Sequence, residues 1–445
     1  MATSWPKSLE NFEMMEPCRI IGVLDNGSRS LTADALAHLR QAEVVIGGSR
    51  LLALLADAIA PSAERRDLTG QLSQVPVWID DGQQAGKKVV VVATGDPLCH
   101  GIAHFLIGKL GRERLDILPN LSMLQLACAR FGLAWQEVRI GSVHSRDVGE
   151  WLCGADARHG LYRLLQLLRQ SPLTAVLTSP DNTPDRIARM LQLETLSEDY
   201  DIAVLSRLMQ AQEANSGWLP IDEAAGRRFD YPNIVLIRRK PVKKEALFGL
   251  PDQRYQQRKP DKGLITKREV RAVSLARMAL KPNSIVWDIG AGSGSVGLEA
   301  ARLCPQGHVY AIEKNAEDAA IVTANRSSLR VSNYTLRLGR APDGLDSWPD
   351  PDAVFIGGSG GELRDLIVLC LNRMRDEGQL VMNFATLENL AAATEVLKTT
   401  GADWDVVQLQ AARSKPILNM NRLQAENPIW IVCAQCGASQ ESKHE

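Results

Sequence analysis

The sequence predicts two α/β domains joined end to end, and two observations lead to this prediction. The chain has 445 residues, which exceeds the roughly 250–300 residues at which a single hydrophobic core usually stops growing. Short apolar runs alternate with longer segments of helical periodicity along the chain, which is typical of α/β folds with largely parallel sheets. We therefore expect two domains of roughly 200 residues each.

The composition is that of a globular protein whose partner is a small molecule. Hydrophobic residues make up 45% and charged residues 23% of the chain, which suffices for large cores and a charged surface. Lys and Arg number 51 against 52 for Asp and Glu, so the balance gives no electrostatic reason to expect nucleic acid. A small-molecule substrate is the expected partner instead.

The start of the chain lacks the pattern of a secretory signal. Its first 17 residues contain no basic segment followed by an apolar run. No later stretch approaches the length of about 18 uninterrupted apolar residues that a membrane-spanning helix needs. We therefore expect a cytoplasmic protein that does not bind membranes.

The eight cysteines are widely spaced, and most lie in apolar segments where a reduced thiol behaves as a small hydrophobic side chain. Cys433 and Cys436 form a CxxC pair, and only His444 lies near in sequence as a further ligand. A zinc site needs four ligands at suitable spacing. We therefore predict no metal site.

The first half, residues 17–240, contains short apolar runs that predict strands with helices between them. The apolar spacing after Ser30 predicts a helix that either Ser30 or Thr32 caps. The predicted strands are Ile20–Leu24, Val44–Ile46, Val89–Ala93, Ala175–Thr178 and Ile234–Ile237.

A polar connector, residues 241–262, is predicted between the domains. The stretch from Arg238 to Asp261 is rich in Lys, Arg, Gln and Pro, with one brief apolar interruption. This composition is typical of a solvated linker. The same charges could instead form a rim that receives an anionic substrate, because cationic side chains near a cleft raise the local concentration of carboxylates.

The second half, residues 263–437, shows a regular succession of strands and helices. Such a succession predicts right-handed crossovers and a doubly wound sheet. The predicted strands are Ser284–Ile289, His308–Ile312, Tyr334–Leu338, Ala353–Ile356 and Gly378–Asn383. The predicted helices are Lys267–Leu280, Val296–Leu303, Glu317–Leu329, Leu363–Asn372 and a further one from Glu388.

The clearest chemical motif is SIVWDIGAGSGSVGLEAAR, from Ser284 to Arg302. An apolar strand, Asp288, three glycines at alternate positions and a helix follow one another directly. Glycines here permit a tight turn and remove Cβ atoms that would keep a nucleotide-like ligand from the backbone. The residues expected to contact this ligand are Gly290, Ala291, Gly292, Ser293 and Gly294.

The glycine spacing helps to identify the ligand. A dinucleotide-binding loop usually reads Gly-x-Gly-x-x-Gly, whereas alternate glycines after an Asp resemble the first motif of class I methyltransferases, which have a Rossmann-like fold. Glu313 ends the next strand, where a carboxylate can accept hydrogen bonds from ribose hydroxyls. A carboxylate at that position could bind the ribose of NAD as well as that of S-adenosylmethionine. The alternative is that Glu313 is a surface residue at a strand end with no ligand. Loop and Glu313 together predict S-adenosylmethionine as cofactor.

From Gly263 onward the chain resembles the C-terminal component of the decarboxylating precorrin-6Y methyltransferases. The resemblance implies that Thr266 offers a hydroxyl to the amino-acid end of the cofactor, Glu313 holds its ribose, and Ala341 leaves room beside its adenine. The matching segments are GLITKREVRA, WDIGAGSGSVGLEAAR, YAIEKN, LGRAPDGL, VFIGGSGG and NPIWIV.

The first half resembles the tetrapyrrole methylase family, which supplies the other component of the same enzymes. The resemblance implies cofactor contacts from Gly95, Asp96 and Ser122. The chain departs from the family at Leu24, two positions after a glycine, and at Asn120, and both side chains could narrow the cofactor cleft. The matching segments are IIGVLDNGSRSLTADAL, AEVVIGGSRLL, VVVVATGDPLCHGIAHFL, ILPNLSMLQLACARFGL, SVHSRD and VLTSPDNTPDRIARML.

Together the resemblances imply methylation of a precorrin-6 macrocycle at carbons 5 and 15, with loss of carbon dioxide from the acetate chain on carbon 12, in cobalamin synthesis. Methyl transfer from a sulfonium needs positioning and exclusion of water rather than a protein nucleophile. No catalytic residue is therefore assigned, and His144 could be structural or functional. Members of both families form oligomers, so a homo-oligomer is expected.

The substrate carries several carboxylates, so its site needs Arg or Lys for charge-assisted hydrogen bonds. Lys267, Arg268 and Arg340 adjoin the cofactor motifs and are the candidates, although each could be a solvated charge. Two other functions stay open. One is a class I methyltransferase for RNA or protein with an N-terminal recognition module, and the other is an N-terminal domain that has become a scaffold.

Overall fold

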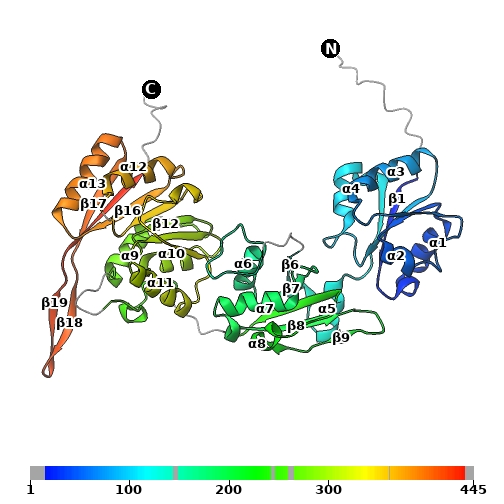
Figure 1. Cartoon of the computed structure of the whole chain (residues 1–445), viewed down its shortest axis with the longest axis horizontal. Helices are drawn as coiled ribbons and strands as arrows, with labels where there is room; N and C mark the ends of the chain where they lie inside the picture. Colours follow the sequence, from blue (N-terminus) through cyan, green and yellow to red (C-terminus); the bar gives the residue numbers. More distant parts are fainter. Residues whose placement is uncertain (1–15, 144–148, 242–245, 259–264, 360, 436–445) are drawn as a thin grey trace, which may run out of the picture.

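The computed structural model describes residues 16–143, 149–241, 246–258, 265–359 and 361–435. Within these ranges three sheets with packed helices follow one another along the chain, and a two-stranded hairpin projects beyond the third sheet. Figure 1 shows the second sheet, mostly green, between the first, in blue, and the third, in yellow to red. The N-terminal half therefore contains two of the sheets.

The first sheet is parallel in all its described pairings. Its strands are β1 (Cys18–Val23), β2 (Val44–Gly47), β3 (Glu64–Asp67), β4 (Val89–Thr94) and β5 (Leu115–Leu118), in the order β3-β2-β4-β1-β5. Successive residues Ile20 and Ile21 enter different buried clusters, so both faces are covered. The covering helices are α1 (Ala33–Gln41), α2 (Ser49–Leu54), α3 (Val75–Gln84) and α4 (Ile102–Leu110).

Thr32 is the residue that caps α1. Its hydroxyl accepts a hydrogen bond from the Ala35 N–H at 3.2 Å, which is the geometry of an N-cap. Ser30 instead accepts a hydrogen bond from the Leu24 N–H at 3.0 Å. Of the two caps that the sequence allowed, the structure selects Thr32.

The second sheet is mainly antiparallel, which corrects the expectation of a largely parallel first half. Its strands are β6 (Arg139–Ser142), β7 (Leu173–Leu177), β8 (Tyr200–Ser206), β9 (Ala214–Asn215), β10 (Leu219–Pro220) and β11 (Asn233–Arg239), with the order β10-β8-β11-β7-β6. β11 runs antiparallel to both β7 and β8, and only β6 and β7 are parallel. The prediction failed because a strand that is buried on both faces is a continuous apolar run whether it pairs in a parallel or an antiparallel direction. The helices here are α5 (Met123–Phe131), α6 (Tyr162–Gln170), α7 (Pro184–Leu193) and α8 (Ile221–Ala225).

The third sheet confirms the doubly wound prediction. Its strands are β12 (Ile285–Ile289), β13 (His308–Glu313), β14 (Tyr334–Leu338), β15 (Ala353–Ile356), β16 (Gln379–Phe384), β17 (Asp403–Leu409) and β20 (Ile429–Gln435), in the order β14-β13-β12-β15-β16-β20-β17. The chain builds outward from β12 in one direction and continues from β15 in the other. The strand order therefore reverses between β12 and β15, and ligands of such sheets bind at the carboxyl ends of the strands there.

Helices cover both faces of the third sheet. Val286 and Trp287, adjacent on β12, belong to different buried clusters. The helices are α9 (Arg268–Arg277), α10 (Ser295–Leu303), α11 (Ala316–Ser328), α12 (Leu363–Arg373) and α13 (Leu387–Thr400). The hairpin of β18 (Ala412–Ile417) and β19 (Met420–Ala425) extends away from this domain and was not predicted (Figure 1).

The described part of the connector belongs to the C-terminal domain, which corrects the expectation of a solvated linker for these residues. Leu250 and Tyr255 are each 3% exposed and belong to a core cluster of the third sheet. The apolar residues of the connector are isolated among charged residues and show no helical or strand periodicity. Their packing against the third sheet could therefore not be predicted from the sequence. The connector therefore helps to build the domain that follows it.

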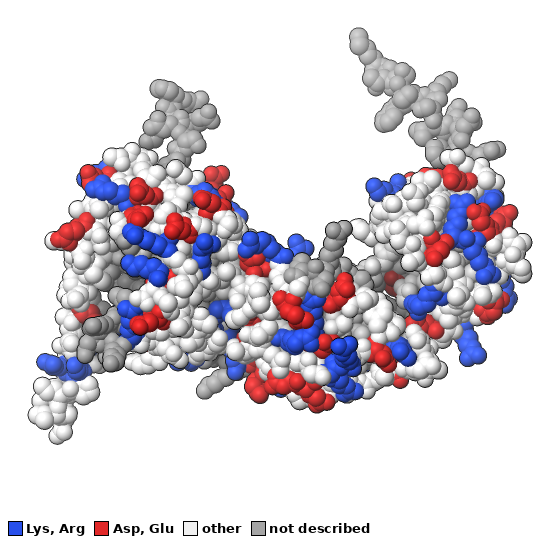
Figure 2. All heavy atoms as spheres, viewed as in Figure 1, with Lys and Arg blue, Asp and Glu red and all other residues white. Residues whose placement is uncertain are grey.

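The surface carries both charges, as the composition predicts. On the face in Figure 2, positive and negative side chains are interspersed over all three parts of the molecule. Among the helices of the described ranges, none combines the length and apolar character needed to cross a bilayer.

The second and third sheets belong to units that meet through polar contacts. Tyr162 on α6 lies 2.7 Å from Nδ1 of His308 on β13, and Nε2 of His308 lies 2.8 Å from the Thr335 hydroxyl, which donates to the Gly154 carbonyl. Because the Thr335 proton is used at Gly154, His308 donates through Nε2 and accepts at Nδ1. Further pairs across this interface include Arg326–Glu194, Arg326–Cys153, Arg330–Asp199, Arg169–Ser332, Thr195–Ser327 and Gln170–Pro305.

A pH dependence of stability follows from His308. Burial lowers its pKa to about 3, with Arg326 acting in the same direction and Asp156 opposing it. In the unfolded chain this histidine has an ordinary pKa of about 6.5. Between about pH 6.5 and pH 3 the unfolded chain therefore binds a proton at His308 that the folded chain does not bind, so stability falls as the pH drops below about 6.5. The expected loss is up to about 1.4 kcal/mol for each pH unit.

Thermal unfolding near pH 7.5 and near pH 5 measures this effect. His308→Gln is expected to lose less stability than the unchanged protein on acidification, whereas His38→Gln, at a half-buried position on α1, is expected to match the unchanged protein. Equal losses in all three proteins would contradict the assignment.

Candidate functional site

The loop after β12 has the geometry that alternate glycines allow. Gly290, Gly292 and Gly294 have φ values of +73°, +58° and +75°, in the left-handed region that L side chains rarely adopt. A Cβ on Gly290 would lie 2.3 Å from the Gly358 carbonyl oxygen, in the loop after β15. The loops after the two switch-point strands therefore touch through their backbones, and only glycine fits at Gly290.

Glu313, at the end of β13, holds this loop. Its carboxylate accepts hydrogen bonds from the Gly292 N–H and the Asn315 N–H, both at 2.9 Å, and the residue is 6% exposed. The N–H groups of Gly290 and Ala291 also donate to the Ile312 carbonyl, at 3.0 and 3.2 Å. Each carboxylate oxygen keeps a second lone pair that a hydroxyl can use. Hydrogen bonding of Glu313 to a ribose remains a prediction.

Two buried polar atoms beside the loop have no partner among the described residues. These are Oδ1 of Asp288 and the hydroxyl of Ser293, and both residues are at most 5% exposed. The other oxygen of Asp288 accepts a hydrogen bond from Tyr334 at 3.2 Å. Burial raises the pKa of Asp288 to about 7, and the Tyr334 hydrogen bond opposes this shift. Unsatisfied buried groups are rare in folded proteins and mark sites where a ligand or water can bind.

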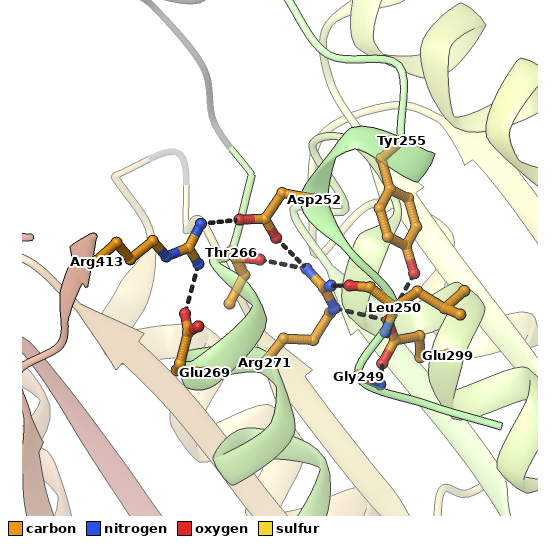
Figure 3. A network of polar contacts seen from close by, with 9 residues as sticks. All are labelled: Gly249, Leu250, Asp252, Tyr255, Thr266, Glu269, Arg271, Glu299 and Arg413. Carbon is orange, nitrogen blue, oxygen red and sulfur yellow. Dashed lines mark hydrogen bonds and ion pairs between the residues drawn. The ribbon is translucent and has the colours of Figure 1, made fainter. Parts of the chain in front are cut away.

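A second network holds the segment before α9 (Figure 3). Arg271 is fully buried and donates to Glu299 at 2.8 Å and to the Thr266 carbonyl at 2.6 Å. Glu299 also accepts hydrogen bonds from the backbone N–H of Leu250 at 3.0 Å and from the Tyr255 hydroxyl at 2.8 Å. One buried guanidinium thus joins the connector, α9, α10 and Thr266.

Asp252 extends this network to the hairpin. It lies 3.3 Å from Arg271 and accepts a hydrogen bond from Arg413, on β18, at 2.8 Å. Arg413 also pairs with Glu269 on α9. The base of the hairpin is therefore tied to the connector and to the start of α9.

The structure brings most of the predicted C-terminal site residues to one edge. Gly290–Gly294, Glu313 and Ala341 follow the carboxyl ends of β12, β13 and β14, and Ala341 is buried. Arg340 is exposed and forms an ion pair with Glu362 at 2.7 Å. Thr266, Lys267 and Arg268 lie at the N-terminus of α9, where Thr266 and Lys267 are half-buried and Arg268 is exposed.

A comparable meeting of loops occurs on the first sheet. Gly95, after β4, has φ +66° and donates to the Val23 carbonyl at 2.8 Å. A Cβ on Gly22 would lie 2.1 Å from the Gly95 oxygen and 2.7 Å from the Asn120 nitrogen. Asp96 accepts from the Leu98 N–H at 2.9 Å, and Ser122 caps α5 through a capping box with Gln125. The predicted Gly95, Asp96 and Ser122 therefore lie where the loops after β1, β4 and β5 converge.

The two departures from the family have structural partners. The Asn120 side chain donates to the carbonyls of Gly22 and Ser30, at 3.2 and 2.9 Å. Leu24 is 5% exposed and packs in a cluster with Leu124 and Leu205. Asn120 thus braces the first loop and Leu24 joins the core, while their effect on the cleft stays a prediction.

Sequence reasoning missed Asp25, which is 9% exposed. It accepts hydrogen bonds from Arg50 and from Gln210, each at 2.6 Å. Gln210 follows β8, so Asp25 joins the first sheet to the second. The only sequence signal is an acidic residue directly after the first strand, which is too common to single out a site.

The described residues contain no cluster of three or more His, Cys, Asp or Glu side chains that could hold a metal ion. Cys436, His444 and His144 lie outside the described ranges.

A doubly wound sheet with an alternate-glycine loop at its switch point, preceded by a second α/β domain, defines the class as a two-domain methyltransferase. Residues 18–215 match the family described as Tetrapyrrole (Corrin/Porphyrin) Methylases, and residues 259–434 match the family described as Precorrin methyltransferase domain.

Similar proteins cover one or both domains. A precorrin-6Y C(5,15)-methyltransferase [decarboxylating] of Sinorhizobium sp is 29% identical over 92% of this chain and 94% of its own length. A cobalt-precorrin-6B C(15)-methyltransferase (decarboxylating) of Salmonella typhimurium is 37% identical over 38% of this chain and 88% of its own length. A solved precorrin-6y C5,15-methyltransferase structure from Geobacter metallireducens is 38% identical, with a TM-score of 0.41, and covers 43% of this chain and 100% of its own. The chain belongs to the family of decarboxylating precorrin-6Y C(5,15)-methyltransferases.

The Arg271 network predicts a large stability effect. Glu299→Gln keeps the shape of the side chain but removes the closer of the two carboxylates that pair with the buried Arg271, at 2.8 Å for Glu299 against 3.3 Å for Asp252. Breaking a buried ion pair in this way costs about 3–5 kcal/mol, so the C-terminal domain should unfold at a temperature roughly 6–20 °C lower. Glu395→Gln, which breaks an exposed pair with Arg364, should cost at most about 1 kcal/mol.

Differential scanning calorimetry of the two variants measures both effects. Equal unfolding temperatures for the two variants would mean that the Arg271–Glu299 ion pair does not stabilise the C-terminal domain more than the exposed pair does.

Proposed function

We propose that this chain methylates a precorrin-6 macrocycle at carbons 5 and 15 with S-adenosylmethionine and removes carbon dioxide from the acetate chain on carbon 12. The observation that carries the proposal is the conjunction of the two family matches, in this order, on one chain. The relatives that share the conjunction over about nine-tenths of the chain are named for this reaction.

We assign methylation at carbon 15 and the decarboxylation to the C-terminal domain. The relatives named C(15)-methyltransferases (decarboxylating) align with about two-fifths of this chain, which is the length of one domain, and the C-terminal domain is the one that matches the precorrin methyltransferase domain family. Methylation at carbon 5 then belongs to the N-terminal domain. The boundaries that we propose are 17–240 for the first domain and 263–437 for the second, with the connector packed on the second.

The C-terminal loop fits S-adenosylmethionine. Gly290, Ala291 and Gly292 are half-exposed in a loop without bulky side chains, and the unpartnered oxygens of Asp288 and Ser293 lie beside it. Glu313 would hold the ribose, Thr266 the amino-acid end, and Ala341 would leave room for the adenine. The bound cofactor supplies an activated methyl group, so these residues need only bind, orient and exclude water.

The N-terminal site would use Gly95, Asp96 and Ser122. Their loops meet at the carboxyl edge of a parallel sheet, which is where ligands of such sheets bind. This convergence favours a working second site over a scaffold.

Cationic side chains beside the C-terminal site would bind the substrate carboxylates. Arg340 is already paired with Glu362, so a substrate carboxylate would replace or share that partner. Lys267 and Arg268 lie at the start of α9 next to Thr266, whose carbonyl accepts a hydrogen bond from Arg271. A carboxylate at this helix N-terminus also gains from the helix dipole.

A homo-oligomer is also part of the proposal. The hairpin exposes Leu418, Met420 and Leu423 at 92%, 67% and 73%. Exposed apolar side chains gathered on one projecting element are typical of contact surfaces.

Mass spectrometry of the product tests the reaction. The full chain is incubated with a precorrin-6 substrate and S-adenosylmethionine whose methyl group carries deuterium. Two labelled methyl groups gained and one carbon dioxide lost are expected. A product with no labelled methyl group, or a methylated RNA or protein instead, would overturn the proposal.

A glycine substitution separates the two sites. Gly290→Ala places a Cβ 2.3 Å from the Gly358 oxygen at φ +73°, whereas Gly401→Ala has a similar φ of +69° and nothing within 4 Å. The clash forces the loops after β12 and β15 apart, and bringing them back together on binding should cost about 1–3 kcal/mol, so binding at the C-terminal site should weaken about 10-fold or more. Calorimetry should then show one of two binding events lost in Gly290→Ala and both retained in Gly401→Ala.

The product of Gly290→Ala should carry the methyl group at carbon 5 and keep its acetate chain. A product methylated at carbon 15 alone would reverse the assignment of the domains.

A further inference from the structure

A buried ion pair crosses the interface between the two domains. Glu194, at the end of α7, accepts a hydrogen bond from the Arg326 guanidinium at 2.6 Å, and the two side chains are 1% and 5% exposed. The other oxygen of Glu194 accepts from the Trp151 indole at 2.8 Å. Burying such a pair costs desolvation, so it is weak support for stability and needs another explanation.

Arg326 continues the contact into the C-terminal domain. Its Nε donates to the backbone oxygen of Tyr334 at 3.1 Å. Tyr334 is the first residue of β14 and is fully buried, and its hydroxyl donates to Asp288 at 3.2 Å. Asp288 lies two residues before the glycine loop. Three successive contacts therefore lead from Glu194 to the base of the loop.

The helix that carries Arg326, α11, also connects the domain interface to the glycine loop. α11 begins after Asn315, whose N–H binds Glu313, and Arg326 lies in its last turn, at the domain interface. Val322, on the same helix, lies 3.0 Å from where a Cβ of Gly294 would be. A helix is a rigid element, so a shift of Arg326 would move the residues that pack against the loop.

We propose that Glu194 of the N-terminal domain is a positioning residue for the cofactor site of the C-terminal domain. Through Arg326 and Tyr334 it holds Asp288 and the glycine loop, so docking of the first domain strengthens cofactor binding at the second site. This inference rests on the proposed binding of S-adenosylmethionine at that loop.

Binding of S-adenosylmethionine to the full chain, measured by calorimetry, tests the inference. Glu194→Gln removes the charge and Tyr334→Phe removes the hydroxyl, with little change of shape in either case. Each should weaken binding at the C-terminal site about 5-fold or more, the usual range for linked sites, and leave the N-terminal site unchanged. Glu198→Gln, an exposed neighbour of Glu194, is the control and should bind normally.

The double variant Glu194→Gln with Tyr334→Phe separates positioning from general destabilisation. Both changes break the same chain of contacts, so the dissociation constant of the double variant should not exceed the larger of the two single-variant values. If the two changes acted independently, their fold-increases in the dissociation constant would multiply. Arg326→Lys, which keeps the charge but has one donor nitrogen in place of three, is the second route if a variant fails to fold, and it should also weaken binding about 5-fold.

Normal binding by Glu194→Gln or by Arg326→Lys, or losses that multiply in the double variant, would overturn the inference. Absence of binding at the C-terminal site in the unchanged protein would instead overturn the proposed function, and this inference with it.

Discussion

The close approach of two backbones at the switch point of the third sheet is the constraint on which the site depends. A Cβ on Gly290 would lie 2.3 Å from the Gly358 carbonyl oxygen, so the loops after β12 and β15 touch through their backbones and together form the floor of the proposed site. Glu313 then fastens that floor to the end of β13 through the Gly292 N–H. The glycines of the loop after β12 carry no Cβ, which is the feature that lets a nucleoside approach a backbone closely.

Two buried polar networks involve elements next to this floor. The Arg271 network joins the connector, α9 and α10, and it holds the backbone of Thr266. The Arg326 network joins α11 and β14 to the N-terminal domain. Both place charges where water is excluded, which is costly unless every partner is present. The fused chain supplies partners for these charges from the connector and from the other domain.

The sequence predicted what repeats locally and missed what depends on distant contacts. The β12 to β16 succession was correct because each parallel strand is an apolar run followed by a helix of clear periodicity. The antiparallel β8 and β11 could not be distinguished from parallel strands by that signal, and the packing of Leu250 and Tyr255 was hidden among charges. The glycine loop and Glu313 could be identified because their spacing is local. Glu194, Arg326 and Asp25 gain their roles only from partners far away in the chain.

A crystal structure of the full chain with S-adenosylhomocysteine would test the central claim most directly. We expect electron density for the nucleoside on the loop of Gly290 to Gly294, with its ribose hydroxyls within hydrogen-bond distance of the Glu313 carboxylate. Density for the nucleoside away from β12 and β13, or a loop filled by neighbouring side chains, would contradict the account.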